Sequence, residues 1–273
     1  MTHLLATSDL HVGYPENREI VAGLRPVSAD DWLIVAGDVA ERTVEIEWTL
    51  STLRERFGTV IWAPGNHELW TTKDDPVQAR GEVRYTHLVE LCRRLGVLTP
   101  EDPYPVWEGP AGPVTVAPLF LLYDYTFRVD GVHTKEAALA KAVRAGVVCT
   151  DEYYLHPDPY PTRDDWCAAR VAATERRLTE HDPDIPLVLI NHWPLVREPT
   201  RILRYPDFAL WCGTELTADW HTKFNTAAAV YGHLHIPRTT EYDGVRFEEV
   251  SLGYPREWQA RAKPPRIPRV ILP

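Results

Sequence analysis

Long apolar stretches are missing from this chain, and none approaches the roughly 20 residues needed to cross a bilayer. Residues 1–5 also lack the basic segment and the long apolar core of a signal peptide. The four cysteines in 273 residues are widely separated and form no Cys-x-x-Cys pair, which argues against a zinc knuckle or a thioredoxin-type redox site. We therefore expect a cytoplasmic protein with reduced cysteines and no membrane segment.

Basic residues are also fewer than acidic ones. The 29 Lys and Arg residues against 39 Asp and Glu residues give a formal net charge of −10. Because nucleic acids and anionic membranes attract clustered Lys and Arg, this balance disfavours both as partners. With 44% hydrophobic residues and neither low-complexity tracts nor internal repeats, the chain is expected to form a single domain over residues 1–273.

Short apolar runs rich in β-branched residues recur along the chain, and each is followed by a polar block. We expect buried strands at residues 4–7, 32–36, 60–63, 187–190 and 227–231. The polar blocks that follow them are Asp9-Leu10-His11, Gly37-Asp38, Gly65-Asn66-His67-Glu68, Asn191-His192 and Gly232-His233-Leu234-His235. Because ligands of open α/β folds gather at the C-terminal ends of strands, we expect these blocks to lie close together.

Helical patterns alternate with the strands, as expected of an α/β fold. They cover residues 43–57 and 83–95, and a third helix is expected from an N-cap at Thr162 towards residue 181. Residues 238–250 predict a β-hairpin with a tight Asp-Gly turn. The Tyr-rich segment 119–160, with one helical stretch near 135–145, fits none of the regular βα units and is predicted to be a small cap insertion over the site.

The order of the polar blocks resembles the signature of the calcineurin-like metallophosphoesterases, which runs Asp-x-His, Gly-Asp, Gly-Asn-His-Asp/Glu, His and Gly-His-x-His. Every block is present, from position 9 to position 235. The resemblance implies the fold of that family, a four-layer β-sandwich flanked by helices. It also implies a binuclear metal centre that hydrolyses a phosphoester by attack of a metal-bridged hydroxide.

Carried over residue by residue, the resemblance implies seven metal ligands. One ion is assigned Asp9, His11 and His235, the other is assigned Asn66, His192 and His233, and Asp38 bridges the two. A shared carboxylate holds two cations about 3.5–4 Å apart against their repulsion. Oxygen and imidazole ligands without thiolate favour Mn or Fe, with Zn as the alternative.

Other residues near the ligands have different expected roles. In the family, the His of the Gly-Asn-His block is not a ligand, so His67 is expected to act beside Asn66 as a general acid or as a stabiliser of the transition state. Glu68 either orients groups around the site or is a carboxylate at the surface or at a helix N-terminus. Glu41 occupies the position at which purple acid phosphatases have a Tyr ligand, which excludes that subfamily.

The signature leaves the phosphoester open. Residues 208–214, 219–221 and 243–256 resemble actinobacterial metallophosphoesterases that remove 4′-phosphopantetheine from carrier proteins. This resemblance implies that the substrate is the phosphodiester linking 4′-phosphopantetheine to holo-acyl carrier protein. The alternatives are a nucleotide or cyclic-nucleotide phosphodiesterase, a protein phosphatase and, outside the enzymes, a binding scaffold, which the complete set of ligand positions disfavours.

An acyl carrier protein is acidic, so an enzyme of net charge −10 needs a concentrated basic face to bind it. Arg201 and Arg204, which follow His192 closely together with Arg197, are candidates; ordinary solvated charge is the alternative. Further basic residues near the C-terminus are Arg256, Arg261, Lys263, Arg266 and Arg269. Trp193 and Tyr125 are candidate walls of a pocket for a pantetheine arm or a nucleotide base, with core packing as the alternative for Trp193.

Overall fold

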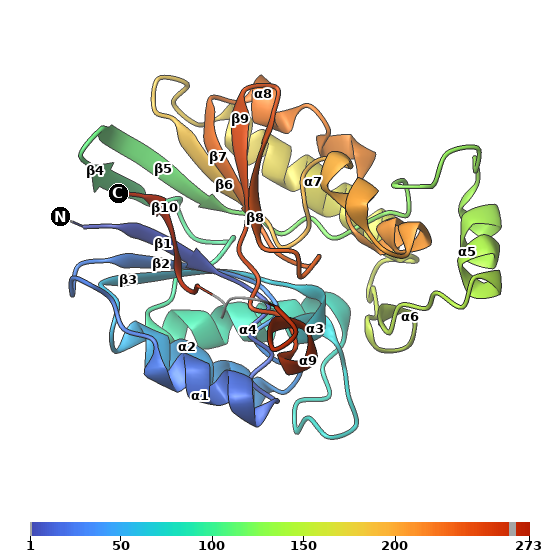
Figure 1. The fold of residues 1–273 in the computed structure, drawn as a ribbon, viewed down its shortest axis with the longest axis horizontal. Coiled ribbons are helices and arrows are strands. Elements are labelled where there is room, and N and C mark those ends of the chain that lie inside the picture. Colours follow the sequence, from blue (N-terminus) through green and yellow to red (C-terminus); the bar gives the residue numbers. More distant parts are fainter. Residues whose placement is uncertain (1, 262–265) are drawn as a thin grey trace.

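Two β-sheets packed face to face between layers of helices form the centre of the computed structural model, which describes residues 2–261 and 266–273 (Figure 1). Lys263 therefore lies outside the described residues. The first sheet has the strand order β10-β1-β2-β3, and the second has the order β4-β5-β6-β7-β9-β8. Figure 1 shows α1, α2 and α4 on the outer side of the first sheet, and α7 and α8 on the outer side of the second.

The secondary-structure elements have the following bounds. The strands are β1 Leu4–Thr7, β2 Trp32–Ala36, β3 Thr59–Ala63, β4 Val106–Gly109, β5 Gly112–Pro118, β6 Leu187–Ile190, β7 Thr226–Tyr231, β8 Arg238–Tyr242, β9 Val245–Glu249 and β10 Arg269–Leu272. The α-helices are α1 Pro15–Gly23, α2 Thr43–Arg54, α3 Asn66–Leu69, α4 Gly81–Leu95, α5 Lys135–Arg144, α6 Asp151–Tyr154, α7 Arg163–Thr179, α8 Trp220–Lys223 and α9 Pro255–Trp258. Three 3₁₀-helices are η1 Glu198–Ile202, η2 Pro206–Trp211 and η3 Glu215–Thr217.

The apolar runs of the central strands are continuous because both faces of each sheet are buried. Successive side chains of a strand point to opposite faces. In β2, Ile34 packs between the sheets in one cluster with Val188 of β6, whereas Leu33 and Val35 belong to the cluster beneath the helices. All four side chains are fully buried. The parallel pairing of β1 with β2, and of β2 with β3, brings the C-terminal ends of these strands to one edge.

The five predicted strands are confirmed to within one residue at each end. Thr162 is confirmed as the N-cap of α7, because its side chain accepts a hydrogen bond from the backbone N–H of Asp165. The helix predicted over 43–57 is too long: α2 ends at Arg54, and the N–H of Arg56 bonds to the carbonyl of Leu53 in a tighter turn. That turn brings the chain back through Gly58 into β3.

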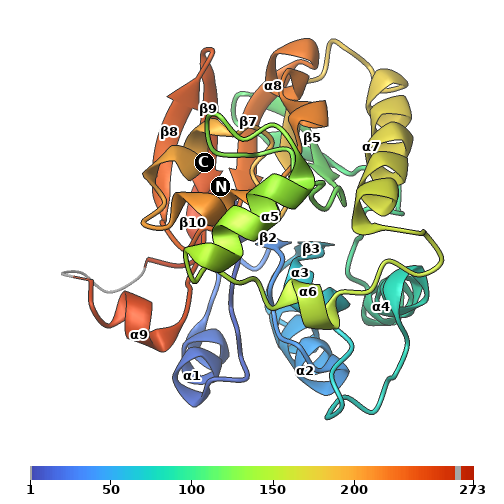
Figure 2. The same cartoon turned by 90° about the vertical axis from the view of Figure 1, so that its right-hand side faces the viewer.

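Strands β4, β5 and β10 were not predicted. The first two form an antiparallel hairpin whose Gly- and Pro-rich turn hides the strand periodicity, and β5 continues the second sheet in parallel with β6. Strand β10 pairs antiparallel with β1, at the opposite end of the chain. Residues 135–144 form α5 as expected, and Figure 2, which looks onto the end of the molecule carrying α5 and α6, shows both nearest the viewer. Among the described residues no helix combines the length and the apolar character needed to span a membrane.

Candidate metal centre

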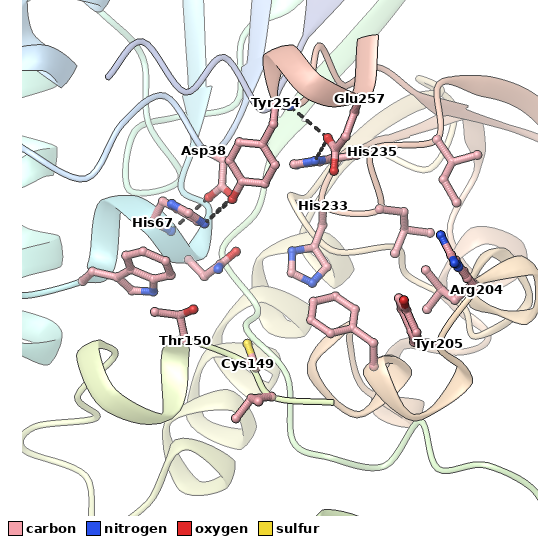
Figure 3. Close-up of a pocket in the computed structure, with 17 residues that line it drawn as sticks. Asp38, His67, Cys149, Thr150, Arg204, Tyr205, His233, His235, Tyr254 and Glu257 are labelled. Carbon is pink, nitrogen blue, oxygen red and sulfur yellow. Dashed lines mark hydrogen bonds and ion pairs between the residues drawn. The ribbon is translucent and has the colours of Figure 1, made fainter. Parts of the chain in front are cut away.

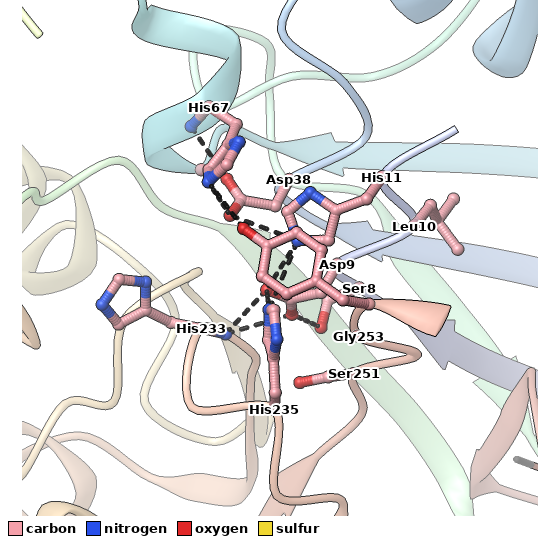
Figure 4. A network of polar contacts seen from close by, with 12 residues as sticks. Ser8, Asp9, Leu10, His11, Asp38, His67, His233, His235, Ser251 and Gly253 are labelled. Atoms are coloured by element: carbon pink, nitrogen blue, oxygen red, sulfur yellow. Dashed lines mark hydrogen bonds and ion pairs between the residues drawn. The ribbon is translucent and has the colours of Figure 1, made fainter. Parts of the chain in front are cut away.

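The five polar blocks meet where the C-terminal edges of the two sheets come together. Three blocks follow β1, β2 and β3 of the first sheet, and two follow β6 and β7 of the second. Potential donor atoms lie within 4.8 Å of one another in three sets. Two of them match the expected ligands, Asp9 with His11 and His235, and Asp38 with His192 and His233, and the third joins His11 and Asp38 to His67. Figure 4 shows the side chains of the first set converging beside Asp38.

Asp38 lies between the two sets. Its Oδ2 atom is 3.4 Å from Nε2 of His192 and 4.0 Å from Nε2 of His11. Asp38 follows β2 and His11 follows β1, both in the first sheet, whereas His192 follows β6 of the second sheet. A carboxylate in this place can serve both sets at once, which is the geometry that the resemblance implies for a bridging ligand.

The donor set fits metal ions. Nε2 of His11 is 3.3 Å from Nε2 of His235, and Nε2 of His192 is 3.2 Å from Nδ1 of His233. Two facing imidazole nitrogens can share only one proton, so a cation bound by both satisfies such a pair better than the protein alone does. The sets combine imidazole with carboxylate and contain no thiolate, which suits Mn, Fe or Zn.

The backbone of the ligand blocks is held in an unusual conformation. Left-handed φ angles occur at Asp9 (52°), His11 (41°), Asp38 (55°), His233 (68°) and His235 (54°). Such angles cost non-glycine residues about 1–3 kcal/mol each and persist only where the surroundings enforce them. The glycine before Asn66 has a steric role, because a Cβ atom on Gly65 would lie 2.2 Å from Oδ1 of Asp38.

Glu68 is an internal support of the site and not a surface carboxylate. It is fully buried, and its two carboxylate oxygens accept hydrogen bonds from the backbone N–H groups of Asp38 and Val39, both at 2.9 Å. Burial and the nearby charge of Asp38 raise the pKa of Glu68 to about 7. Of the two roles considered for Glu68, the structure supports the orienting one.

Asn66 is oriented by a residue of α6. Its amide Nδ2 donates a hydrogen bond to Oδ1 of Asp151 at 2.9 Å, which directs its carbonyl oxygen towards Nε2 of His192, 3.2 Å away. The indole N–H of Trp70 donates to the same Asp151 oxygen at 2.6 Å. Burial raises the pKa of Asp151 above its usual value, although these two hydrogen bonds oppose the shift. Sequence reasoning did not find Asp151, which is far from Asn66 along the chain.

His67 has a carboxylate partner that sequence reasoning also missed as a functional residue. Its Nδ1 lies 2.7 Å from Oε1 of Glu41, and its ring stacks on Trp70 with a centroid distance of 3.8 Å. Burial disfavours the charged ring, but Asp38 and Glu41 outweigh this and raise the pKa of His67 above its usual value. The available signal was the position of Glu41, three residues after the predicted bridging Asp38.

A second missed group lies in residues 253–257. Oε2 of Glu257 is 2.6 Å from Nδ1 of His235, which orients that predicted ligand. The ring of Tyr254 stacks on His11 with a centroid distance of 4.4 Å and an interplanar angle of 24°. Burial and the charges of nearby carboxylates, that of Asp38 first, raise the pKa of Tyr254, so its phenol stays neutral.

A cavity of about 480 Å³ opens beside these residues (Figure 3). Asn66, Asp38, His233 and His235 line one side of it. The rest of its wall is largely apolar and aromatic and includes Trp70, Val148, Cys149, Leu203, Tyr205, Phe208, Leu234 and Ile236. This wall can accommodate an aliphatic or amide-containing group next to the ligand sets.

The four predicted substrate-binding residues differ in position. Arg204 lines the cavity, whereas Arg201 lines a separate groove together with Arg197. Trp193 and Tyr125 are buried, with 0% and 1% of their surface exposed, and neither is among the described residues that line the cavity. Substrate contact by these two aromatic residues stays a prediction.

The basic residues near the C-terminus are partly engaged within the chain. Arg269 forms an ion pair with Glu248 at 2.7 Å, and Arg261 donates a hydrogen bond to the carbonyl of His235 at 3.1 Å. The guanidinium of Arg256 lies 5.5 Å from the ring centroid of Tyr254. These contacts reduce the charge that the segment has available for a partner.

Comparisons with known proteins agree with this geometry. A model of the family described as calcineurin-like phosphoesterase matches residues 2–237. An acyl-carrier-protein phosphodiesterase of Mycobacterium tuberculosis is 59% identical over 270 residues, which cover 99% of this chain and 83% of that protein. The crystal structure of phosphopantetheinyl hydrolase from the same organism matches with a TM-score of 0.97 and 58% identity, covering 100% of this chain and 96% of the other.

The contact between Glu41 and His67 predicts that Glu41→Ala lowers kcat about 10- to 100-fold while the metal content is unchanged, because the His67 ring loses the acceptor that orients it. Glu41→Gln should restore most of the loss, since its amide oxygen can accept the same hydrogen bond. The substrate is methyl phenyl phosphate, whose poor leaving group needs a proton. Glu47→Ala, an exposed change on α2, is the control. Full kcat in Glu41→Ala would contradict the role.

Proposed function

This chain belongs to the calcineurin-like phosphoesterase family, and we propose that within it the protein removes 4′-phosphopantetheine from holo-acyl carrier protein by hydrolysing the phosphodiester that joins them. The family makes the chain a phosphoric ester hydrolase with a binuclear metal centre. The observation that carries the substrate proposal is the 59% identity, over almost the whole chain, to an acyl-carrier-protein phosphodiesterase.

We assign the metals as the motif implies. Asp9, His11 and His235 hold one ion, Asn66, His192 and His233 hold the other, and Asp38 bridges them; the short distances within the two sets support this assignment. Mn and Fe suit the donors, with Zn as the alternative. Bound ions would supply Lewis acidity and a water activated for attack on phosphorus.

The protein contributes the proton for the leaving group. Glu41 binds Nδ1 of His67, which leaves Nε2 directed away from that contact and 3.7 Å from Oδ2 of Asp38. We assign His67 as the general acid that gives this proton to the carrier-side oxygen as the ester bond breaks. Asn66 acts beside it, with its amide fixed by Asp151.

The wall of the cavity supports a pantetheine arm. Its apolar and aromatic lining suits the dimethyl and amide groups of that arm, which need contact area more than charge. Val148, Cys149 and Thr150 reach the cavity from the segment 119–160. We propose that this segment is a cap within a single domain, and that it helps to select the arm.

The rim of the cavity is the proposed contact with the carrier protein. Arg204 and Tyr205 are exposed at the cavity, and Arg201 and Ile202 are exposed just before them in η1. Two guanidinium groups beside apolar side chains suit an acidic partner. A cytoplasmic location is part of the proposal and is supported by the four cysteines, which are all free and buried.

The proposal predicts a mass loss on the carrier protein. Purified enzyme should be incubated with holo-acyl carrier protein, cyclic AMP and bis-p-nitrophenyl phosphate in parallel, with activating metal present. We expect the holo-carrier protein to lose the mass of 4′-phosphopantetheine, detected by intact-protein mass spectrometry, and cyclic AMP to stay intact. Hydrolysis of cyclic AMP with an unchanged carrier protein would reject the proposal in favour of a cyclic-nucleotide phosphodiesterase.

The bridging assignment predicts that Asp38→Ala abolishes binding of two metals and all activity, since Asp38 is the ligand that both ions share in this assignment. His67→Ala should keep the metals and lower kcat about 100-fold on methyl phenyl phosphate. Metal analysis of both variants next to the wild type separates the two roles. Wild-type metal content in an inactive Asp38→Ala protein would exclude Asp38 as the bridge.

If the carrier protein binds at the rim, reversing the charge there should weaken binding of the carrier protein and not that of a small diester. Replacing Arg201 and Arg204 together by Glu should raise KM for holo-carrier protein about tenfold or more, because an attraction becomes a repulsion. KM for bis-p-nitrophenyl phosphate should change much less. Arg94→Glu combined with Arg176→Glu, two exposed changes on α4 and α7, gives the same change in net charge and is the control. Equal increases in KM for both substrates would show that the two arginines do not serve the carrier protein.

A further inference from the structure

The loop that leads into α9 covers the candidate metal centre from beyond the last ligand block. The family match ends at residue 237, and the signature is complete at His235, so Tyr254 belongs to neither. The ring of Tyr254 stacks on His11 and meets His235 edge-on, with centroid distances of 4.4 and 4.9 Å.

The position of Tyr254 is fixed at both ends. Before it, the N–H of Gly253 donates to the carbonyl of Asp9 at 3.1 Å, and the carbonyl of Gly253 accepts from Asn17 at 3.0 Å. A side chain at Gly253 is excluded, because φ is +82° and a Cβ atom would lie 2.8 Å from Oε2 of Glu257. After it, that same oxygen accepts the N–H of Tyr254 at 2.9 Å. These hydrogen bonds hold the backbone on both sides of Tyr254 and so fix the place from which its side chain starts.

The hydroxyl of Tyr254 points at the atom assigned as proton donor. Its oxygen is 3.4 Å from Nε2 of His67. Figure 3 shows the two side chains facing one another, and Tyr254 also lines the cavity. This distance exceeds that of a strong hydrogen bond. No shorter partner of the hydroxyl is found within residues 2–261 and 266–273, so its proton is available to a group bound in the cavity.

We propose that the hydroxyl of Tyr254 donates a hydrogen bond to the leaving oxygen of the phosphoester, next to His67. An oxygen that approaches Nε2 of His67 closely also comes within reach of a donor 3.4 Å from that nitrogen. His67 gives up its proton as the phosphorus–oxygen bond breaks, and Tyr254 keeps its own proton throughout. The phenol stabilises the charge that develops on the oxygen before the transfer is complete.

The proposal extends the reaction of the same site. It rests on phosphoester hydrolysis there, and it does not depend on whether the leaving group belongs to a carrier protein. Small diesters therefore test it separately from the substrate proposal. If holo-carrier protein proves not to be a substrate, the measurements on small diesters remain decisive for Tyr254.

The test uses Tyr254→Phe in the metal-loaded enzyme, since phenylalanine keeps the ring on His11 and removes only the hydroxyl. We expect kcat/KM for methyl phenyl phosphate to fall about 30- to 100-fold, and that for methyl 4-nitrophenyl phosphate to fall less than about threefold. The nitrophenolate leaves readily without a hydrogen bond, whereas the phenolate does not. Metal content, measured on the same sample, should equal that of the wild type.

The control is Tyr14→Phe. Tyr14 meets the ring of Tyr254 edge-on at 5.6 Å, is 45% exposed, and also loses one phenol hydroxyl in this variant. It should leave both rates unchanged. In the variant combining His67→Ala with Tyr254→Phe, the loss on methyl phenyl phosphate should be smaller than the product of the two single losses, because both groups act on one oxygen.

Three results would overturn the proposal. Equal losses on the two esters would place the hydroxyl away from the leaving oxygen. Unchanged rates on both would remove any part in the reaction. Loss of metal from Tyr254→Phe would show that the hydroxyl maintains the metal centre, which is a structural role, and does not serve the leaving oxygen.

Discussion

The carboxylate of Asp38 lies where the edges of two sheets meet, beyond the apolar cluster that packs between them. Its Oδ2 atom lies 3.4 Å from His192 of one sheet edge and 4.0 Å from His11 of the other, and all three side chains are buried. Burying this many polar groups is costly unless they are paired or bind cations. Metal binding and the packing of the two sheets are therefore coupled, because the donors reach one another only when both sheet edges are in place.

Three of the seven predicted ligands are each supported by a residue that is not itself a ligand. Glu68 holds the backbone of Asp38, Asp151 holds the amide of Asn66, and Glu257 holds His235. Five ligand residues have a strained, left-handed backbone. Such strain persists only where the surrounding structure enforces it, and the supporting residues are part of that structure. The supporting carboxylates come from α3, α6 and α9, so helices far apart in the chain share the task of fixing one site.

The ligand blocks were predictable because each is a contiguous stretch directly after an apolar strand, and both features are local. The residues that support the ligands were not predictable from the sequence. Asp151 and Glu257 lie outside the ligand blocks, and only the fold brings them to Asn66 and His235. Strand β10 was missed for the same reason, since its partner β1 is at the other end of the chain. The aromatic candidates Trp193 and Tyr125 are buried, and their contact with substrate stays a prediction, because residue type alone does not distinguish a cavity wall from the core.

The placement of the C-terminal segment has a consequence for how enzymes of this family diverge. The metal-binding signature ends at His235, yet the chain after it orients that residue, covers His11 and completes the first sheet through β10. Evolution can therefore retain every ligand and still alter the environment of the leaving group by replacing one short loop. Two proteins with identical signatures can therefore differ in their preference for good or poor leaving groups. We expect the residues that cause such a difference at positions 253–257.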